Sequence, residues 1–225
     1  LIKERAETGR IYIMNVDHSN THSSFKDPVY MSNLCQEITL PTKPLQHIDD
    51  ENGEIALCIL SAINVGVIKE LDDLEELCDL AVRALEEIID YQRYPIKAAE
   101  VSTKARRSLG VGYIGLAHYL AKNHVSYEED RAWKLVHDLS EAFQYYLLKA
   151  SNKLAQERGA CEYFDRTKYS DGVMPIDTYK ADVDTIVENK LNYDWDTLRT
   201  DIQQHGLRHS TLSAQMPSES SSVVS

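Results

Sequence analysis

Two short stretches within the first forty positions, residues 10–16 and 33–40, have the pattern of extended chain. Residues 10–16 alternate with β-branched and aromatic side chains, which predicts a strand. A polar, turn-rich loop is expected from residue 17 to about residue 30. Residues 33–40 are a second extended candidate, which Pro41 and Pro44 end.

A near-continuous apolar run at residues 55–67 follows the turn signal Asn52-Gly53. This pattern is typical of a strand that is buried on both faces. A further strand is expected at residues 210–215, near the end of the chain.

Helical spacing of apolar residues marks the longest segments. Apolar residues from Leu71 to Ile88 repeat every three or four positions, behind acidic residues that favour a helix N-terminus. A long amphipathic helix is expected at residues 128–158, and Gly159 can end it. Further helices are expected at residues 109–122, 177–189 and 194–205. Long helices between buried strands predict an α/β architecture, with too few strands to close a sheet by themselves.

Charge and cysteine content narrow the possible functions. The 24 basic and 36 acidic residues give a net charge of −12, which disfavours binding to nucleic acid or to an anionic membrane. No stretch of about 20 apolar residues predicts a membrane span. The chain begins without an initiator methionine, so we expect a piece of a longer protein. Four dispersed cysteines indicate a reducing compartment, where a disulfide would belong to the chemistry.

The candidate chemistry lies in the run Ser32-Asn33-Leu34-Cys35-Gln36-Glu37. In extended chain, residues two apart point the same way, so Asn33, Cys35 and Glu37 are expected to share one face. An amide, a thiol and a carboxylate together can orient a substrate, carry a reactive sulfur and accept a proton. By itself the pattern is better explained by a packed cysteine between two ordinary polar residues, because free cysteines are usually inert.

Several segments, in order along the whole chain, resemble the large subunits of class I ribonucleotide reductases, and most closely those of the aerobic, diphosphate-reducing branch of bacteria and their phages. The matching segments are residues 8–13, 15–18, 32–38, 40–44, 52–58, 144–152, 206–208 and 216–221. The resemblance implies a fold that is part of a ten-stranded α/β barrel with an active-site finger loop. All of residues 1–225 would then be the central-to-late section of the catalytic barrel domain, incomplete at both ends.

The resemblance also implies roles for the central run. The thiol of Cys35 would carry a transient thiyl radical that takes the 3′ hydrogen of the ribose. Such a sulfur is expected to be a buried, neutral thiol in a site that excludes water. Glu37 would take the proton of the 3′ hydroxyl as general base, and Asn33 would orient the sugar through its hydroxyls.

Cys58 lies in the apolar run, where a packed core thiol is the simpler interpretation. The resemblance makes it one of two cysteines that supply the reducing electrons and end as a disulfide, with a partner that falls earlier in the subunit. Cys78 and Cys161 match no such role and are expected to be structural or incidental.

The run Met216-Pro217-Ser218-Glu219-Ser220-Ser221 can present backbone N–H groups to an anion, although a serine-rich tail is an equally simple interpretation. The resemblance implies that it binds the substrate diphosphate. The residues involved would be Ser218, Glu219, Ser220 and Ser221, with Glu219 contributing its backbone N–H.

The same resemblance implies partners and cofactors beyond this chain. The chain itself would bind no cofactor. A di-iron small (beta) subunit would supply the radical, thioredoxin or glutaredoxin the electrons, and ATP or dNTP effectors would bind elsewhere on the large subunit. The setting would be the cytoplasm, or the host cytoplasm for a phage protein. An inactive truncated product, or an assembly module of a split reductase, is the alternative.

Three other signals are weaker. Residues 110–115 match the dinucleotide pattern GxGxxG, but the polar lead-in is wrong for a nicotinamide-dependent dehydrogenase, and glycines that allow close helix packing are the simpler explanation. Asp17, His18 and His22 fall in the expected loop, and no metal site is predicted there. The side chains of Tyr145 and Tyr146 are expected to pack within a helix. The resemblance implies that the radical-relay tyrosines of the family fall outside this chain.

Overall fold

Two parallel strands with a layer of helices on one face organise the computed structural model, which describes residues 1–186, 190–220 and 223. The α-helices and strands, in chain order, are α1 (Ile2–Thr8), α2 (Val16–His22), β1 (Ile59–Asn64), α3 (Asp73–Tyr91), α4 (Lys97–Arg106), β2 (Leu109–Ile114), α5 (Leu116–Lys122), α6 (Asp130–Arg158), α7 (Pro175–Thr178) and α8 (Trp195–His205). The 3₁₀ helices are η1 (Phe164–Arg166), η2 (Lys168–Asp171) and η3 (Ala181–Thr185).

The sheet is formed by β1 and β2, which pair in parallel with Ile59 opposite Leu109. The expected strand at 210–215 is an extended segment along the other edge of β2. The backbone N–H of Leu109 donates to Thr211 O (3.1 Å), and that of Val111 donates to Leu212 O (2.8 Å). The expected strand at 55–67 shortens to β1, and its Leu60 is 39% exposed because no described helix covers that face.

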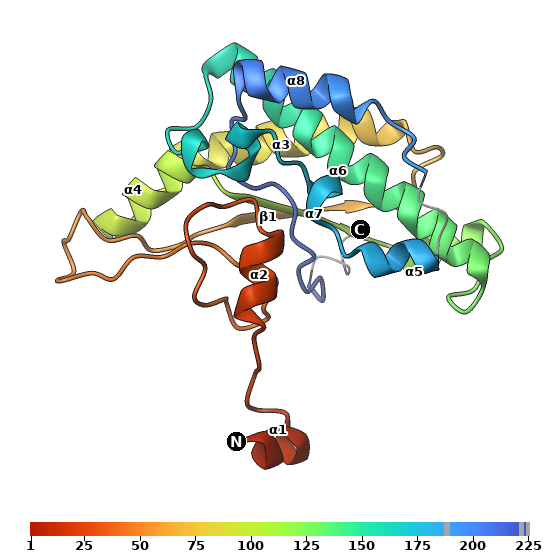
Figure 1. Cartoon of the computed structure of the whole chain (residues 1–225), viewed down its shortest axis with the longest axis horizontal. Helices are drawn as coiled ribbons and strands as arrows, with labels where there is room; N and C mark the ends of the chain where they lie inside the picture. The colour runs from red at the N-terminus through yellow and green to blue at the C-terminus, as the bar shows by residue number, and fades with distance from the viewer. Residues whose placement is uncertain (187–189, 221–222, 224–225) are drawn as a thin grey trace.

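The helices α3 and α6 cover one face of the strands, and α8 packs on α6 (Figure 1). Their shared core includes Leu74, Val82, Leu139 and Leu147, packed with Val111 of β2. The loops that precede β1 lie on the opposite side of the sheet (Figure 1). One face of the sheet is therefore sealed, and the other carries the loops with the candidate chemistry.

The predicted helices at 71–88, 128–158 and 194–205 are confirmed as α3, α6 and α8. Gly159 follows α6 with a φ of 85°, which is the left-handed geometry that favours glycine at a helix end. Asp194 begins α8 by accepting the backbone N–H of Thr197 at 3.0 Å. These elements formed as expected because local capping and an amphipathic stripe agree with the packing.

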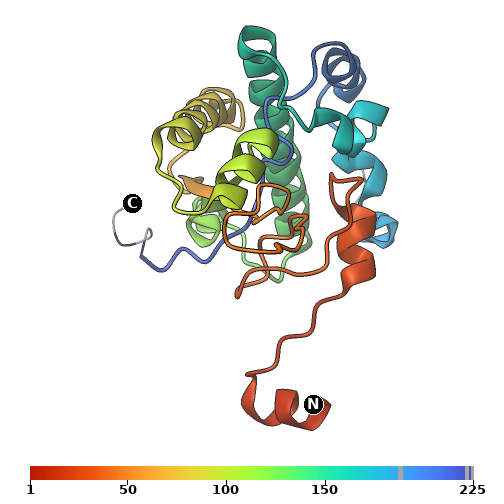
Figure 2. The same ribbon diagram turned by 90° about the vertical axis from the view of Figure 1, so that its left-hand side faces the viewer.

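The prediction of a strand at residues 10–16 is wrong, and the loop expected from residue 17 is correct only after α2. Residues 10–15 form no strand, and α2 occupies part of the expected loop. The side chain of Asn20 donates to Val16 O within α2 and to Val29 O, so a polar residue ties the helix to the following loop. The segment before α2 lies along no strand of the described chain. In Figure 2, α1 stands well apart from the remainder, and it buries no side chain.

The predicted helix at 109–122 is also wrong in its first half, which is β2. Gly115, with a φ of 81°, then turns the chain into α5. An apolar run that contains glycines pairs along β1 because it is buried between that strand and the segment after Ser210. The predicted helix at 177–189 is replaced by the short helices α7 and η3, and its last three residues lie outside the described part of the chain.

Two buried ion-pair clusters hold the loops to the helical layer. Glu86 of α3 is fully buried and accepts hydrogen bonds from Arg107 Nε (2.7 Å), Arg208 Nε (2.7 Å) and His209 Nε2 (3.0 Å). Burial opposes ionisation of Glu86, but these bonds outweigh it and lower its pKa to about 2. The Glu86 cluster therefore fixes the entry to β2 and the start of the segment that returns beside it.

The second cluster centres on Arg106 at the end of α4. Its guanidinium pairs with Glu54 (2.7 Å) and Asp27 (2.9 Å), and Arg166 pairs with the same two carboxylates. These contacts anchor the loop that leads to Cys58.

Among the described residues, no helix is long and apolar enough to cross a membrane.

Candidate active site

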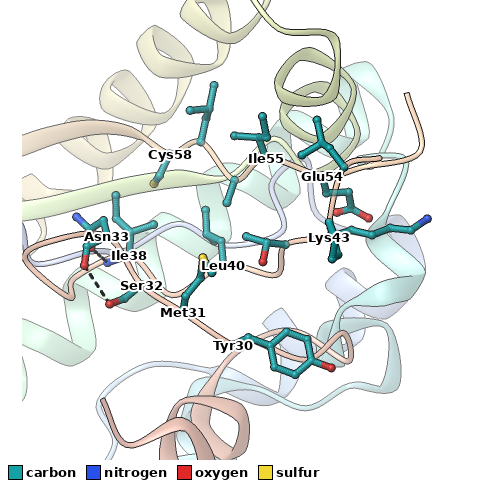
Figure 3. A pocket seen from close by; sticks show the side chains of 15 residues that line it. Tyr30, Met31, Ser32, Asn33, Ile38, Leu40, Lys43, Glu54, Ile55 and Cys58 are labelled. Atoms are coloured by element: carbon teal, nitrogen blue, oxygen red, sulfur yellow. Dashed lines mark hydrogen bonds between the residues drawn. The ribbon is translucent and has the colours of Figure 1, made fainter. Parts of the chain in front are cut away.

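The loops below the sheet line an open cavity of about 800 Å³ between residues 30–45 and residues 54–58 (Figure 3). Most of its wall is apolar, with Met31, Ile38 and Leu40 from the first segment. Polar groups stand at its two ends. Asn33 and Cys58 lie near one end in Figure 3, and Lys43 and Glu54 lie near the other.

The loop that carries Cys35 is a tight turn, so the prediction of extended chain is wrong here. Gln36 takes a left-handed φ of 63°. The Oδ1 of Asn33 accepts the backbone N–H of Ile38 (3.1 Å), and the backbone of Asn33 accepts that of Gln36 (3.2 Å). The Asn33 side chain thus accepts the hydrogen bond of a backbone N–H that a neighbouring strand would accept in a sheet.

This turn separates the side chains that alternation had placed on one face. Cys35 is exposed at the turn and does not line the large cavity, whereas Asn33 does. The prediction that the Cys35 thiol is buried is therefore wrong for this chain. The physical reason is that no other described element packs over the outer side of the turn.

Glu37 lies on the inner side of the turn, close to Cys58. The two residues line a small cavity of about 40 Å³ together with Leu109 of β2 and Ala214 of the returning segment. One carboxylate oxygen of Glu37, Oε2, is buried and has no hydrogen-bond partner among the described residues. Such an oxygen retains the capacity to accept a proton or a hydroxyl hydrogen.

Cys58 is a neutral thiol in this setting. Burial, and secondly the negative charge of Glu37, raise the pKa of Cys58 to about 12. A thiol in this state can give up a hydrogen atom but is a poor nucleophile at neutral pH. Sequence alone could place Cys58 in an apolar run, but it could not show that Glu37 lies beside it.

Cys78 and Cys161 are buried away from both cavities, in agreement with a structural role. Burial raises the pKa of each thiol to about 12. Cys78 packs in the core under α6, and Cys161 follows the end of α6.

The segment that leads to the expected diphosphate site runs along β2 and past Gly112. Ser218 Oγ donates to Met216 O at 3.3 Å, and a turn follows at Glu219 and Ser220. Ser221 lies outside the described residues. The structure thus gives the approach to this site, and the diphosphate role remains a prediction.

Comparison with known proteins decides the family. The model of the ribonucleotide reductase barrel domain matches residues 1–225, the whole chain. The chain belongs to the ribonucleotide reductase family. The predicted fold, an α/β section of the reductase barrel, is confirmed by this match and by parallel strands connected through helices.

Bacterial and viral proteins are among the relatives of this chain. It is 63% identical to the ribonucleoside-diphosphate reductase subunit alpha of Haemophilus influenzae over 228 residues, which is 100% of this chain and 30% of that protein. It is 60% identical to the ribonucleoside-diphosphate reductase 1 subunit alpha of Escherichia coli and 45% identical to the ribonucleoside-diphosphate reductase subunit alpha of Enterobacteria phage T4, with the same coverage. The chain thus spans 30% of the length of these relatives.

The glycine pattern has another role in this reductase section. Gly110 and Gly112 lie inside β2, so the expectation that they allow close helix packing is wrong. They do not form a loop after a strand either. A helix, α4, precedes the strand closely. The dehydrogenase alternative required a phosphate-binding loop between a strand and a helix, and this geometry excludes it.

Two other polar sites differ from expectation or were missed. His18 and His22 lie on α2 rather than in a loop, and the ring of His22 contacts the backbone oxygen of Thr178. Sequence reasoning overlooked a cluster of His137, Asp138 and Glu141 on α6. Glu141 accepts the Trp195 indole N–H (3.0 Å) and backbone N–H groups of the loop before α8. This cluster fastens that loop to α6.

The tyrosine pair at 145–146 packs as predicted. Tyr145 stacks on Tyr193 with ring centroids 4.8 Å apart and meets Trp195 edge-on at 5.4 Å. Tyr146 donates its hydroxyl to Asp72 at 2.8 Å. These rings join α6 to the loop before α8.

Proposed function

We propose that this chain is the part of a ribonucleoside-diphosphate reductase large subunit that carries the radical cysteine, the general base and one reducing cysteine. The observation that carries the proposal is the pair formed by Glu37 and Cys58. A buried carboxylate oxygen without a partner lies beside a neutral thiol, next to a cavity of about 800 Å³. The family match supports the same assignment.

The first step is exchange of a hydrogen atom at Cys35. Its thiyl radical takes the 3′ hydrogen of the ribose and becomes a thiol. Glu37 accepts the proton of the 3′ hydroxyl through its unpaired oxygen. The Oδ1 of Asn33 accepts the backbone N–H of Ile38, so the amide N–H groups of Asn33 remain available to donate to the sugar hydroxyls.

Reduction at the 2′ carbon then uses Cys58 and a second thiol from the rest of the subunit. The 2′ carbon–oxygen bond breaks, the oxygen leaves as water, and a carbon–hydrogen bond takes its place. The two thiols supply the two electrons and two hydrogens and join in a disulfide. Glu37 then gives its proton back to the 3′ oxygen, and Cys35 returns its hydrogen atom to the 3′ carbon, which restores the thiyl radical. The raised pKa of Cys58 keeps its hydrogen in place at neutral pH.

The substrate diphosphate is assigned to Ser218, Glu219, Ser220 and Ser221, which follow the segment paired with β2. A di-iron small subunit provides the radical, and thioredoxin or glutaredoxin re-reduces the disulfide. Effector nucleotides bind outside this chain, and the enzyme works in the cytoplasm. The chain itself supplies no cofactor ligands in this scheme.

The chain by itself is proposed to be inactive. Cys35 is exposed, and water or a stray reductant would quench a radical there. The open sheet face also leaves Leu57 and Leu60 38% and 39% exposed. We propose that the remainder of a large subunit covers both features, since the relatives of this chain are about three times as long as the chain.

The test replaces Glu37 by Gln in the complete large subunit, assembled with its small subunit. This change keeps the size of the side chain and removes the proton acceptor. We expect kcat to fall about 10²-fold or more while KM for the diphosphate stays close to its original value. Glu51→Gln, at an exposed loop position, is the matched control and should leave both constants unchanged. An unchanged kcat in Glu37→Gln contradicts the assignment.

A further inference from the structure

The strand beside Cys58 lacks a side chain at the point of closest approach. Gly110 of β2 pairs with Leu60 of β1, so the two positions face the same way, toward the open side of the sheet. A Cβ at Gly110 would lie 2.9 Å from Cys58 Sγ, 2.5 Å from Leu60 Cδ2 and 3.0 Å from Ala214 Cβ. Any other residue at this position would therefore push against the thiol.

The glycine is not required by the backbone. Gly110 lies within a regular strand, and its φ is not among the positive values found in the described chain. Conformational freedom therefore does not explain this residue. The space that it leaves beside Leu60, the Cys58 sulfur and Ala214 does.

That space matters because the sulfur of a reducing cysteine has to move. Two unbonded sulfurs sit about 3.5–4 Å apart, whereas a disulfide needs about 2.05 Å and a defined torsion. Oxidation of Cys58 therefore requires its Sγ to shift by more than about 1 Å, or to rotate about χ1. In Figure 3 the Cys58 side chain stands at the end of the cavity nearest Asn33.

We propose that Gly110 is a positioning residue that keeps the space in which the Cys58 thiol turns between its substrate-facing and disulfide-forming positions. This inference rests on the proposed function, because it deepens the role of the reducing cysteine. It extends the site to β2, the strand with the glycine pattern. The ribonucleoside diphosphate is the oxidant for the step, because loss of its 2′ oxygen as water takes up the two electrons of the thiols.

The neighbours of Gly110 make Gly110→Ala a specific perturbation. The closest atoms, Leu60 Cδ2 and Cys58 Sγ, are the ends of side chains that can rotate. Ala214 Cβ, at 3.0 Å, cannot rotate away but needs to move only a few tenths of an ångström, so the fold can absorb the methyl group mainly by displacing the thiol and Leu60. At Gly112 the added Cβ would instead meet the backbone oxygen of Ala214 at 2.5 Å, which can be relieved only by moving the chain.

The experiment measures steady-state kinetics of Gly110→Ala in the complete large subunit with its small subunit and reductant. We expect kcat to fall about 10²-fold, because the added methyl group misplaces the thiol. KM for the diphosphate should stay nearly unchanged, because the residues that bind the substrate are not altered. Alkylation of Cys58, followed by peptide mass, should also slow relative to the original subunit, while that of Cys35 does not. Leu60→Ala, which keeps the glycine, should retain the original kcat.

The double variant Leu60→Ala/Gly110→Ala guards against misfolding, since it removes the 2.5 Å contact and leaves the one with Cys58. It should fold and remain impaired in kcat. Full kcat in either variant that carries alanine at 110 overturns the inference. Cys58→Ser separates the two proposals: activity in Cys58→Ser contradicts the proposed function, whereas an inactive Cys58→Ser beside a fully active Gly110→Ala contradicts only the role of Gly110.

Discussion

Replacing Glu86 by Gln should loosen the segment that runs beside β2. Glu86 is fully buried, and its carboxylate holds two arginines and His209. The change removes the negative charge and leaves Arg208 without its buried partner, while Arg107 keeps Asp90 (2.6 Å). Removing one member of a buried ion pair typically costs 3–5 kcal/mol.

The pKa of Glu86 gives a second value for the same cost. It falls from an ordinary 4.5 to about 2, a difference of about 2.5 pH units, which corresponds to about 3 kcal/mol. Because the folded pKa is lowered, this stability is complete above pH 4.5 and disappears as the pH falls toward 2. At neutral pH the whole contribution is present, so Glu86→Gln should lose about 3 kcal/mol.

The assay is amide hydrogen exchange at pH 7 in the complete subunit. The backbone N–H of Leu109 donates to Thr211 and that of Ser210 donates to Arg106, so both report on the attachment of the returning segment. A loss of about 3 kcal/mol should speed their exchange about 10²-fold.

Glu87→Gln is the matched control, since Glu87 is the next residue and its side chain is 63% exposed in a pair with Arg158. A surface pair of this kind contributes less than about 1 kcal/mol. Equal exchange rates in Glu86→Gln and Glu87→Gln would refute the reasoning from burial.

Three further outcomes follow from the site. Alkylation of Cys58 in the complete subunit should speed up about tenfold per pH unit from pH 7 to 9, since its pKa of about 12 leaves the thiolate scarce; a plateau below pH 9 would contradict this. Asn33→Ala should weaken activity and also raise protease cleavage at the turn, because its Oδ1 holds the Ile38 N–H; cleavage equal to that of the original subunit would show that the turn does not depend on this bond. The isolated chain should form no deoxynucleotide, whereas activity without the remaining subunit would contradict the proposed need for cover over Cys35.

Local signals predicted those parts of the fold where capping and amphipathic spacing agree. The helices α3, α6 and α8 are examples, with Gly159 and Asp194 at their ends. Residues 109–114 were misread because an apolar run with glycines fits a helix or a buried strand equally well. The pairing with β1, fifty residues away, decides for a strand.

The site shows the same limit. Alternation placed Cys35 and Glu37 on one face, but Gln36 takes a left-handed conformation that non-glycine residues rarely adopt, and this reverses the arrangement. The proximity of Glu37 and Cys58 depends on how the turn packs against β2. Local spacing carries no information about such a contact between separate loops.

The Glu86 cluster could not be predicted at all. Its partners lie 21, 122 and 123 residues away in the sequence, and a buried glutamate on an amphipathic helix reads as one more surface charge. Only the fold shows that three cationic or hydrogen-bonding groups meet there.

The most direct test of the central claim compares Cys35→Ser with Cys161→Ala in the complete reductase, with deoxynucleotide formation as the readout. Serine keeps the shape of the side chain but cannot carry the sulfur radical, whereas Cys161 is buried away from both cavities. The account predicts background activity for Cys35→Ser and nearly full activity for Cys161→Ala. Appreciable deoxynucleotide formation by Cys35→Ser would contradict it.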